Sequence, residues 1–198
     1  ELLIKDINSL EKRLDKTRKK AKSGDKEANS ELSVIQKILP LLNDGILARN
    51  IKLDKEHQIL LQPLNLLTMK PVLYVTNVSE HEISSGKKST FTNQVFDMAL
   101  KQKNQAISLC GYIEMEISTL HLEEREVFLT EYNLSEPGLN KLIRSAYELL
   151  GLETYFTAGK SEVRAWTIKQ GYNAPQAAGV IHSDFQRGFI KAEIYHYN

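Results

Sequence analysis

Two stretches near the start of the chain carry apolar residues at helical spacing. In each stretch the apolar residues recur in alternating steps of three and four, which places them on one side of a helix. They are Leu3, Ile7, Leu10 and Leu14, followed by Leu32, Ile35, Leu39 and Leu42. Ser23-Gly24-Asp25 separates the two stretches and predicts a turn, since glycine accepts the left-handed geometry that ends helices. The pattern therefore predicts an antiparallel helical hairpin, with Pro40 kinking or ending the second helix.

The middle of the chain alternates between short apolar runs and amphipathic segments. A short helix over 54–61, with Asp54 as its cap, is expected to precede this region. The apolar runs at 71–76 and 106–110 predict strands of a parallel sheet, the first of them buried on both faces. The amphipathic segments at 91–103, 123–132 and 138–150 predict helices. Strand, helix, strand and helix in this order predict an α/β layer.

The end of the chain has a third pattern of apolar and polar residues. Residues 162–168 and 189–195 alternate between apolar and polar side chains and predict two strands. Between them, residues 171–175 predict a turn because glycine and proline lie there, and residues 177–185 predict a helix. These elements indicate a small α+β unit that is incomplete.

Composition excludes several classes of protein. The chain has 198 residues, enough for one ordinary or two small domains, and its formal net charge is +1, so bulk charge does not indicate a nucleic-acid binder. The single cysteine, Cys110, excludes an internal disulfide framework and fits a reducing compartment. No apolar run approaches the roughly 20 residues that cross a bilayer. The opening residues lack a starting methionine and a leader, so we expect a piece of a longer chain.

The first predicted helix carries one local concentration of positive charge. Its basic residues are Lys12, Arg13, Lys16, Arg18, Lys19, Lys20 and Lys22. Glu11 and Asp15 dilute this charge. Two interpretations stay open, namely an ordinary solvated helix face and an arm that contacts phosphates.

The first predicted strand is followed by a motif that could recognise a nucleotide base. In open α/β sheets, ligands bind beyond the carboxyl ends of the strands, and Asn77 lies there. An asparagine amide can donate to adenine N7 and accept from the N6 amino group. Glu80 stands where an aspartate would accept from the N1 and N2 hydrogens of guanine. Alone, Asn-x-x-Glu is also explained by a capped turn with a surface glutamate.

Further motifs occur in unbroken order along the chain. They are residues 70–80 (KPVLYVTNVSE), 109–111 (LCG), 136–140 (EPGLN), 154–159 (TYFTAG), 162–167 (EVRAWT) and 177–185 (AAGVIHSDF). Together they resemble the YchF branch of the Obg-like P-loop NTPases, and the likeness covers nearly the whole chain. The hairpin with Lys-Ala-Lys-Ser-Gly-Asp25 resembles the coiled-coil insertion of that family.

The resemblance implies a fold and domain boundaries. Residues 1–66 would form the inserted helical hairpin, and residues 67–151 the carboxy-terminal part of an α/β nucleotide-binding G domain. Residues 152–198 would begin a TGS domain, a β-grasp module, that is incomplete here.

The resemblance also implies site residues. Asn77, Val78 and Glu80 fall on the altered base-reading motif, in which Val78 replaces the usual lysine. Cys110 and Gly111 fall on the loop that closes over the base from the other side, where GTPases often have Ser-Ala. A backbone contact would survive that difference, whereas a hydroxyl contact would not.

The function implied by the resemblance is that of a cytoplasmic, ribosome-associated ATPase using ATP and Mg²⁺. Ribosome or RNA contacts would involve Lys12, Arg13, Lys16, Lys19, Lys20 and the TGS domain. Two alternatives stay open: an RNA- or ribosome-binding module that acts without nucleotide turnover, and a GTP-dependent switch of the broader Obg group. No membrane partner is expected.

The phosphate-binding loop of such an enzyme is missing from the sequence. At the Gly-Lys pair Gly86-Lys87, a Walker A loop would need glycine at 81 and serine or threonine at 88, where the chain has His81 and Lys88. We therefore expect the P-loop and the Mg²⁺ ligands upstream of Glu1, no catalytic or metal-binding residue here, and no ATP hydrolysis by this chain alone.

Weaker candidate sites have simpler explanations. The pair His182 and Asp184 lacks a third catalytic member, and Trp166 in its alternating strand is expected to serve packing. The paired carboxylates Glu114 and Glu116 have no other support for acid–base chemistry.

Overall fold

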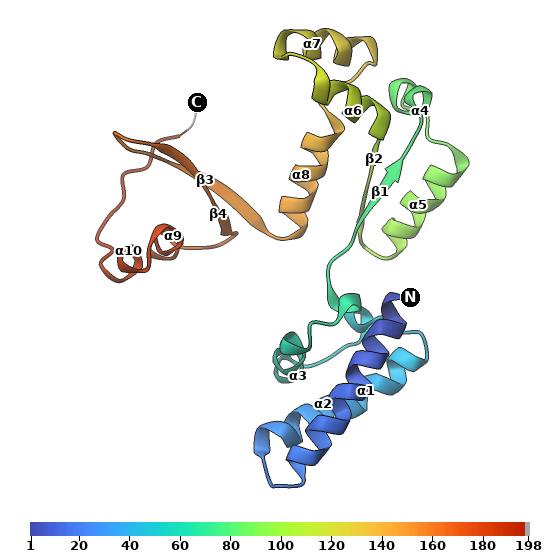
Figure 1. Cartoon of the computed structure of the whole chain (residues 1–198), viewed down its shortest axis with the longest axis vertical. Helices are drawn as coiled ribbons and strands as arrows, with labels where there is room; N and C mark the ends of the chain where they lie inside the picture. Colours follow the sequence, from blue (N-terminus) through green and yellow to red (C-terminus); the bar gives the residue numbers. More distant parts are fainter. Residues whose placement is uncertain (197–198) are drawn as a thin grey trace. The chain divides into compact units, whose positions relative to one another are not determined.

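The chain divides into two compact units, one from Glu1 to Lys70 and one from Pro71 onward (Figure 1). The computed structural model describes residues 1–196. The boundaries inferred at residues 66 and 151 remain predictions.

The first unit begins with the predicted helical hairpin. Helix α1 spans Leu2–Ala21 and helix α2 spans Lys26–Asn43. Gly24 turns the chain between them with φ +86°, and the Asp25 carboxylate caps α2 by accepting from Ala28 N at 3.1 Å. Of the two effects expected of Pro40, a kink or an end, the end is wrong, because α2 runs on to Asn43. Proline lacks a backbone N–H, so residue 40 donates no helical hydrogen bond, and the last turn of α2 forms without that bond.

The rest of the first unit folds back onto the hairpin. It contains helix α3, Lys55–Leu61, and three single 3-10 turns: η1, Ala48–Asn50; η2, Gln62–Leu64; and η3, Leu67–Met69. Asp54 caps α3 as predicted, accepting from His57 N at 2.8 Å. The fully buried core residues are Leu10, Val34, Ile35, Ile38, Leu42, Ala48, Leu61 and Leu66. The apolar stripes of both helices thus meet the returning chain in one core.

A buried carboxylate fixes α1 to the η3 turn. Asp6, only 2% exposed, accepts from Leu67 N at 2.7 Å, from Thr68 N at 2.8 Å and from the Thr68 hydroxyl at 2.7 Å. The same hydroxyl oxygen accepts from Ala48 N at 3.1 Å. Buried polar groups are stable only when they are hydrogen-bonded. Here the carboxylate, the backbone N–H groups and the hydroxyl are hydrogen-bonded to one another. Sequence reasoning did not identify Asp6.

The second unit begins with a two-stranded parallel sheet. Strand β1, Leu73–Asn77, pairs with β2, Gln105–Leu109, with Asn77 opposite Leu109. Helices α4, Glu80–Ser85, and α5, Thr90–Lys101, form the crossover between the strands. Helices α6, Gly111–Thr119, α7, Leu122–Glu131, and α8, Gly138–Leu149, follow β2. Helices α5 and α8 flank the two strands (Figure 1).

This sheet is less covered than the sequence predicted. Val75 in β1 is 44% exposed, whereas a strand buried on both faces was expected. The buried cluster beneath α6 consists of Cys110, Ile113 and Ile117, with partly buried neighbours such as Phe128 and Tyr132. The described part of the unit therefore leaves apolar sheet surface open.

The last elements differ most from the predictions. Strands β3, Leu152–Ala158, and β4, Val163–Lys169, form an antiparallel hairpin, of which only the second was predicted as a strand. Helices α9, Ala174–Ile181, and α10, Ser183–Arg187, replace the single predicted helix and are separated by His182, whose backbone is extended. The strand predicted at 189–195 is wrong, because residues 189–196 have no regular secondary structure.

Within residues 1–196, none of the helices combines the length and the apolar character that a membrane span requires.

Candidate functional site

The candidate site lies where the carboxyl ends of β1 and β2 meet. Asn77 and Leu109 are paired in the sheet register, and Val78 N donates to Leu109 O at 2.9 Å just beyond the last pair. The segment after β1 and the segment after β2 therefore leave the sheet side by side. This is the edge at which open α/β sheets bind ligands.

The Asn77 side chain has a defined orientation. Its Oδ1 atom accepts a hydrogen bond from Gly111 N at 2.9 Å. Because a backbone N–H can only donate, the atom facing Gly111 has to be the oxygen of the amide. No group in residues 1–196 accepts from Nδ2, and the side chain is exposed. The amide therefore presents two free donor hydrogens and the second lone pair of its oxygen.

Gly111 and Cys110 form the start of α6. Gly111 is the first helical residue, so its N–H would lack a partner within the helix, and Asn77 supplies one. A Cβ atom at Gly111 would lie 3.4 Å from Asn77 Oδ1. The Cys110 side chain is 4% exposed and packs with Ile113 and Ile117. The Cys110 side chain is therefore part of this core cluster.

Glu80 is held by a residue that sequence reasoning missed. It is the first residue of α4, and its Oε2 atom accepts from the Tyr132 hydroxyl at 3.3 Å. Burial raises the pKa of Tyr132, and the neighbouring Glu80 carboxylate raises it further. The Glu116 carboxylate raises the pKa of Tyr112, with burial and Glu80 adding to the effect. No sequence pattern linked these tyrosines to Glu80, because they follow it by many residues.

Glu114 has a structural role in this arrangement. Its carboxylate accepts from Gly138 N at 2.7 Å and from Leu139 N at 3.0 Å, and so caps the start of α8. A carboxylate that accepts two backbone N–H groups is committed to that helix end. The interpretation of Glu114 and Glu116 as an acid–base pair therefore finds no support.

A pocket of about 290 Å³ lies beside this cap. Its walls include Ser108, Glu114, Gly138, Lys141 and the ion pair between Arg144 and Glu136. The Arg144 guanidinium lowers the pKa of the Glu136 carboxyl through hydrogen bonding. Of the predicted site residues, Cys110 lines this pocket, whereas Asn77 and Gly111 do not. The pocket is thus distinct from the exposed amide of Asn77.

The weaker candidates are assigned by their contacts. His182 Nδ1 accepts from Asp184 N at 3.2 Å, so this exposed pair caps α10. Trp166 Nε1 donates to Thr157 Oγ1 at 2.9 Å across the β3–β4 hairpin, and the Arg164 guanidinium lies over its ring.

The loop at Gly86 does not resemble a phosphate cradle. Gly86 ends α4 with φ +67°, and the Lys88 ammonium lies 3.3 Å from the centre of the Phe96 ring. As for metals, residues 1–196 bring together no group of three or more His, Cys, Asp or Glu side chains able to hold an ion.

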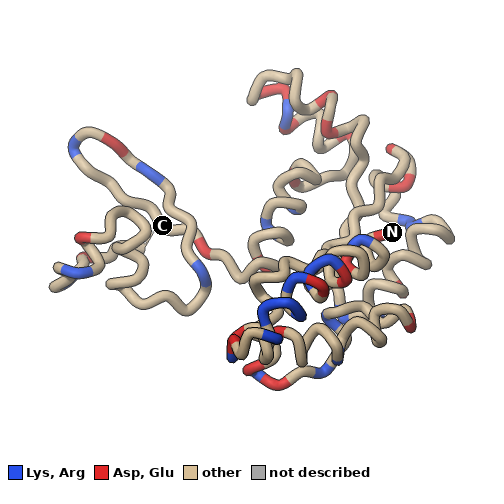
Figure 2. The backbone as a smooth tube through the Cα atoms, turned by 60° about the horizontal axis from the view of Figure 1, so that its bottom comes forward, with Lys and Arg blue, Asp and Glu red and all other residues tan. Residues whose placement is uncertain are grey.

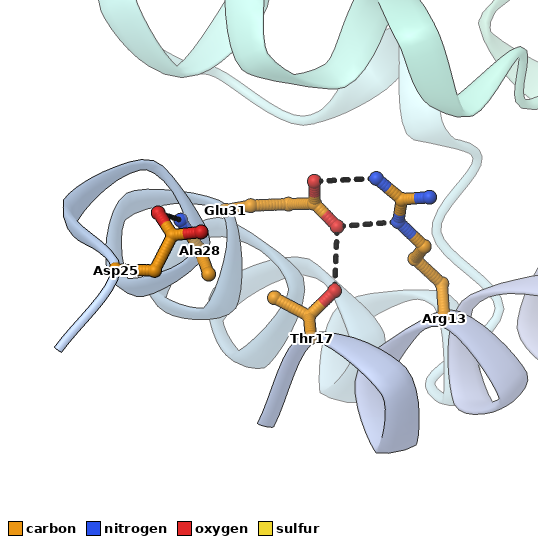
Figure 3. A network of polar contacts seen from close by, with 5 residues as sticks. All are labelled: Arg13, Thr17, Asp25, Ala28 and Glu31. Carbon is orange, nitrogen blue, oxygen red and sulfur yellow. Dashed lines mark hydrogen bonds and ion pairs between the residues drawn. The ribbon is translucent and has the colours of Figure 1, made fainter. Parts of the chain in front are cut away.

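The basic helix is partly neutralised within the hairpin. Arg13 binds Glu31 of α2 through two hydrogen bonds, Nε to Oε1 at 2.6 Å and Nη2 to Oε2 at 2.8 Å, and the Thr17 hydroxyl also donates to Oε1 at 2.7 Å (Figure 3). The hydrogen bond from Arg13 lowers the pKa of Glu31. Arg13 thus holds the two helices together.

The lysines of α1 remain exposed, and Lys and Arg positions gather along the second half of the helix (Figure 2). Lys12, Lys16 and Lys19 follow helical spacing of four and three residues, on the side opposite the buried Leu10. They form a continuous row of positive charge, which we call the lysine row.

Comparison with known proteins gives consistent results. A family model described as YchF-GTPase_C, protein of unknown function (DUF933), matches residues 152–198. The chain is 45% identical to the ribosome-binding ATPase YchF of Haemophilus influenzae over 197 residues, which is all of this chain and 53% of that protein. It is 44% identical to the ribosome-binding ATPase YchF of Bacillus subtilis, over all of this chain and 54% of that protein.

A solved structure agrees with the sequence relatives. The structure of the Schizosaccharomyces pombe YchF GTPase superposes with a TM-score of 0.79 at 31% identity, covering 96% of this chain and 52% of that one. The chain therefore spans about half the length of the curated relatives it matches. The likeness to YchF proteins that the sequence motifs indicated is thus confirmed over the whole length of the chain.

Proposed function

We propose that this chain is the base-recognition and partner-binding part of a ribosome-associated ATPase that binds and hydrolyses ATP. The observation that carries the proposal is the Asn77 amide, oriented by Gly111 N–H with its nitrogen free. The bacterial relatives are named ribosome-binding ATPases, which agrees with the proposal.

The chemistry of the amide favours adenine over guanine. Nδ2 can donate to adenine N7 while the second lone pair of Oδ1 accepts from the N6 amino group. Guanine carries an oxygen at that position, and two acceptor oxygens facing each other repel. Val78 would line the base with an apolar side chain, and the backbone around Cys110 and Gly111 would face its other side.

The open sheet supports the idea of a partial nucleotide-binding domain. A parallel sheet is normally covered on both faces, yet Val75 of β1 is 44% exposed. Further strands beside β1 would cover it, and they would bring the P-loop and the Mg²⁺ ligands. In this proposal residues 67–151 complete a G domain, residues 1–66 are its inserted hairpin, and the β3–β4 hairpin begins a β-grasp module. Residues 1–198 alone then hydrolyse no ATP.

A GTP-dependent switch is the alternative that a specific observation favours, because the Schizosaccharomyces pombe relative is called a GTPase. Calorimetry on the complete protein with ADP and GDP separates the two. We expect ADP to bind at least tenfold more tightly, the value of one lost base contact. Equal or tighter binding of GDP would disprove the proposed preference for adenine nucleotides.

The lysine row is our proposed contact with ribosomal RNA, and Lys20 would lie at its edge. Arg13 would not take part, because it binds Glu31 of α2. Replacing Lys12 and Lys16 with glutamine should weaken ribosome co-sedimentation and flatten its salt dependence, because fewer counterions are released. Replacing the exposed Lys26 and Lys37 of α2 is the matched control. If both pairs behave alike, the lysine row is an ordinary solvated face. Ribosome binding that is unaffected by nucleotide would favour a module that acts without turnover.

A further inference from the structure

Tyr132 joins the apolar core of the second unit to the candidate site. It lies directly after α7, and its ring centre is 5.0 Å from that of Phe128. Both rings pack against the buried cluster of Cys110, Ile113 and Ile117. The position of the tyrosine hydroxyl is therefore fixed by the core rather than by the surface.

That hydroxyl points at the one carboxylate of the Asn-x-x-Glu motif. It donates to Glu80 Oε2 at 3.3 Å, and 52 residues separate the two in the chain. The Glu116 carboxylate and burial raise the pKa of Tyr112, which follows Gly111 in α6, and the Glu80 charge adds to this effect. The Glu80 carboxylate is therefore hydrogen-bonded to a tyrosine that is anchored in the core.

The position of this carboxylate matters for the choice of base. Guanine differs from adenine in presenting an N1–H and an N2 amino group, which a carboxylate can accept together. Glu80 is the nearest carboxylate to Asn77 in the chain and has the length to move. A free glutamate could turn toward the base and supply that acceptor, whereas a tethered one could not.

We propose that Tyr132 is a positioning residue for base selection: its hydroxyl holds the Glu80 carboxylate away from the base and so prevents guanine from being accepted. The inference rests on the proposed function, since it assumes that the base lies at Asn77. Tyr132 lies outside the base-reading motifs, and in this proposal it contributes to the specificity for adenine.

The test is calorimetry on the complete protein with ADP, GDP and inosine diphosphate. Tyr132→Phe keeps the ring in the core and removes only the hydroxyl. We expect the ratio of ADP to GDP affinity to fall at least threefold, with GDP gaining more than inosine diphosphate, which lacks the N2 amino group. Tyr147→Phe is the matched control, because it removes a hydroxyl that bonds Thr167 Oγ1 at 3.2 Å. It should leave the ratio unchanged.

A second variant separates positioning from a general loss of structure. Adding Glu80→Gln to Tyr132→Phe should restore the wild-type ratio, because the amide is a poorer acceptor for two N–H groups than the carboxylate. In the wild-type background, Glu80→Gln should change GDP affinity less than twofold. A purely structural tyrosine would weaken both nucleotides equally.

The outcomes distinguish the two proposals. A wild-type protein that prefers ADP, combined with an unchanged ratio in Tyr132→Phe, overturns the role of the tyrosine alone. A change of GDP affinity above twofold in Glu80→Gln overturns it as well, even if Tyr132→Phe fails to fold. A wild-type protein that binds GDP as tightly as ADP overturns both proposals.

Discussion

The side-chain oxygen of Asn77 accepts a hydrogen bond from the backbone N–H of Gly111 at 2.9 Å. This contact joins the carboxyl end of β1 to the first turn of α6, and it uses a donor that every helix leaves unpaired at its start. The amide is thereby oriented before any ligand arrives. Pre-orientation of this kind lowers the entropy lost on binding.

Asn77→Asp isolates the proposed base contact from this structural one. Aspartate keeps an oxygen for Gly111 N–H but has no hydrogens to donate to a base. We expect ADP affinity of the complete protein to fall by roughly 1–3 kcal/mol in calorimetry, with the thermal midpoint unchanged. Asn77→Ala should lose similar affinity and in addition about 1 kcal/mol of stability, because Gly111 N–H loses its partner. Wild-type ADP affinity in Asn77→Asp would contradict the proposed role.

Periodicity predicted the elements whose hydrophobic pattern is strong and local. The helical hairpin, the two parallel strands and α8 all occur close to their predicted bounds. The strand β3 was missed because its residues, Leu152–Ala158, mix apolar and polar side chains without clear alternation. The strand predicted at 189–195 does alternate, but within residues 1–196 no neighbouring strand pairs with it. Alternation shows that a segment suits a sheet, whereas pairing requires a partner.

The site was predictable only in part. The sequence indicated Asn77, Glu80 and Gly111 because they follow strands and match a family motif, and their role in binding stays a prediction. The contacts that fix them come from residues far away in the chain, such as Tyr132 for Glu80. The role of Asp6 was not predicted for the same reason, since its hydrogen-bond partners lie 61 and 62 residues later in the chain.

Gly138→Ala should destabilise the second unit. A Cβ atom there would lie 2.8 Å from Glu114 Oε1 and 3.0 Å from Leu109 Cβ, so either the helix cap or the strand has to move. We expect a loss of about 1–3 kcal/mol in urea unfolding, the usual cost of overpacking. Gly111→Ala is the matched control, because it also stands at the first position of a helix but its Cβ would have an ordinary 3.4 Å contact. Equal losses in both variants would mean that the Glu114 cap is not the cause.

Asp6→Ala should destabilise the first unit more than any exposed acidic substitution. It leaves Leu67 N, Thr68 N and the Thr68 hydroxyl without their acceptor in a buried position. We expect a loss of about 2–4 kcal/mol in urea unfolding followed by circular dichroism. Asp15→Ala, an exposed change on the same helix, is the control. A loss below about 1 kcal/mol would show that water replaces the carboxylate.

The ion pair between Arg13 and Glu31 makes the stability of the hairpin depend on pH. The pKa of Glu31 is lowered in the folded chain, chiefly by the hydrogen bond from Arg13, from an ordinary value of 4.5. The stabilisation is therefore complete above that ordinary value and is lost as the pH falls through the lowered one. We expect the Glu31→Gln variant to be less stable by about 1 kcal/mol near neutral pH and to show a shallower loss of stability in acid. The exposed Glu11→Gln should keep the wild-type profile in urea unfolding at a series of pH values. If Glu31→Gln followed the wild-type profile at every pH, the pair would contribute nothing to the hairpin.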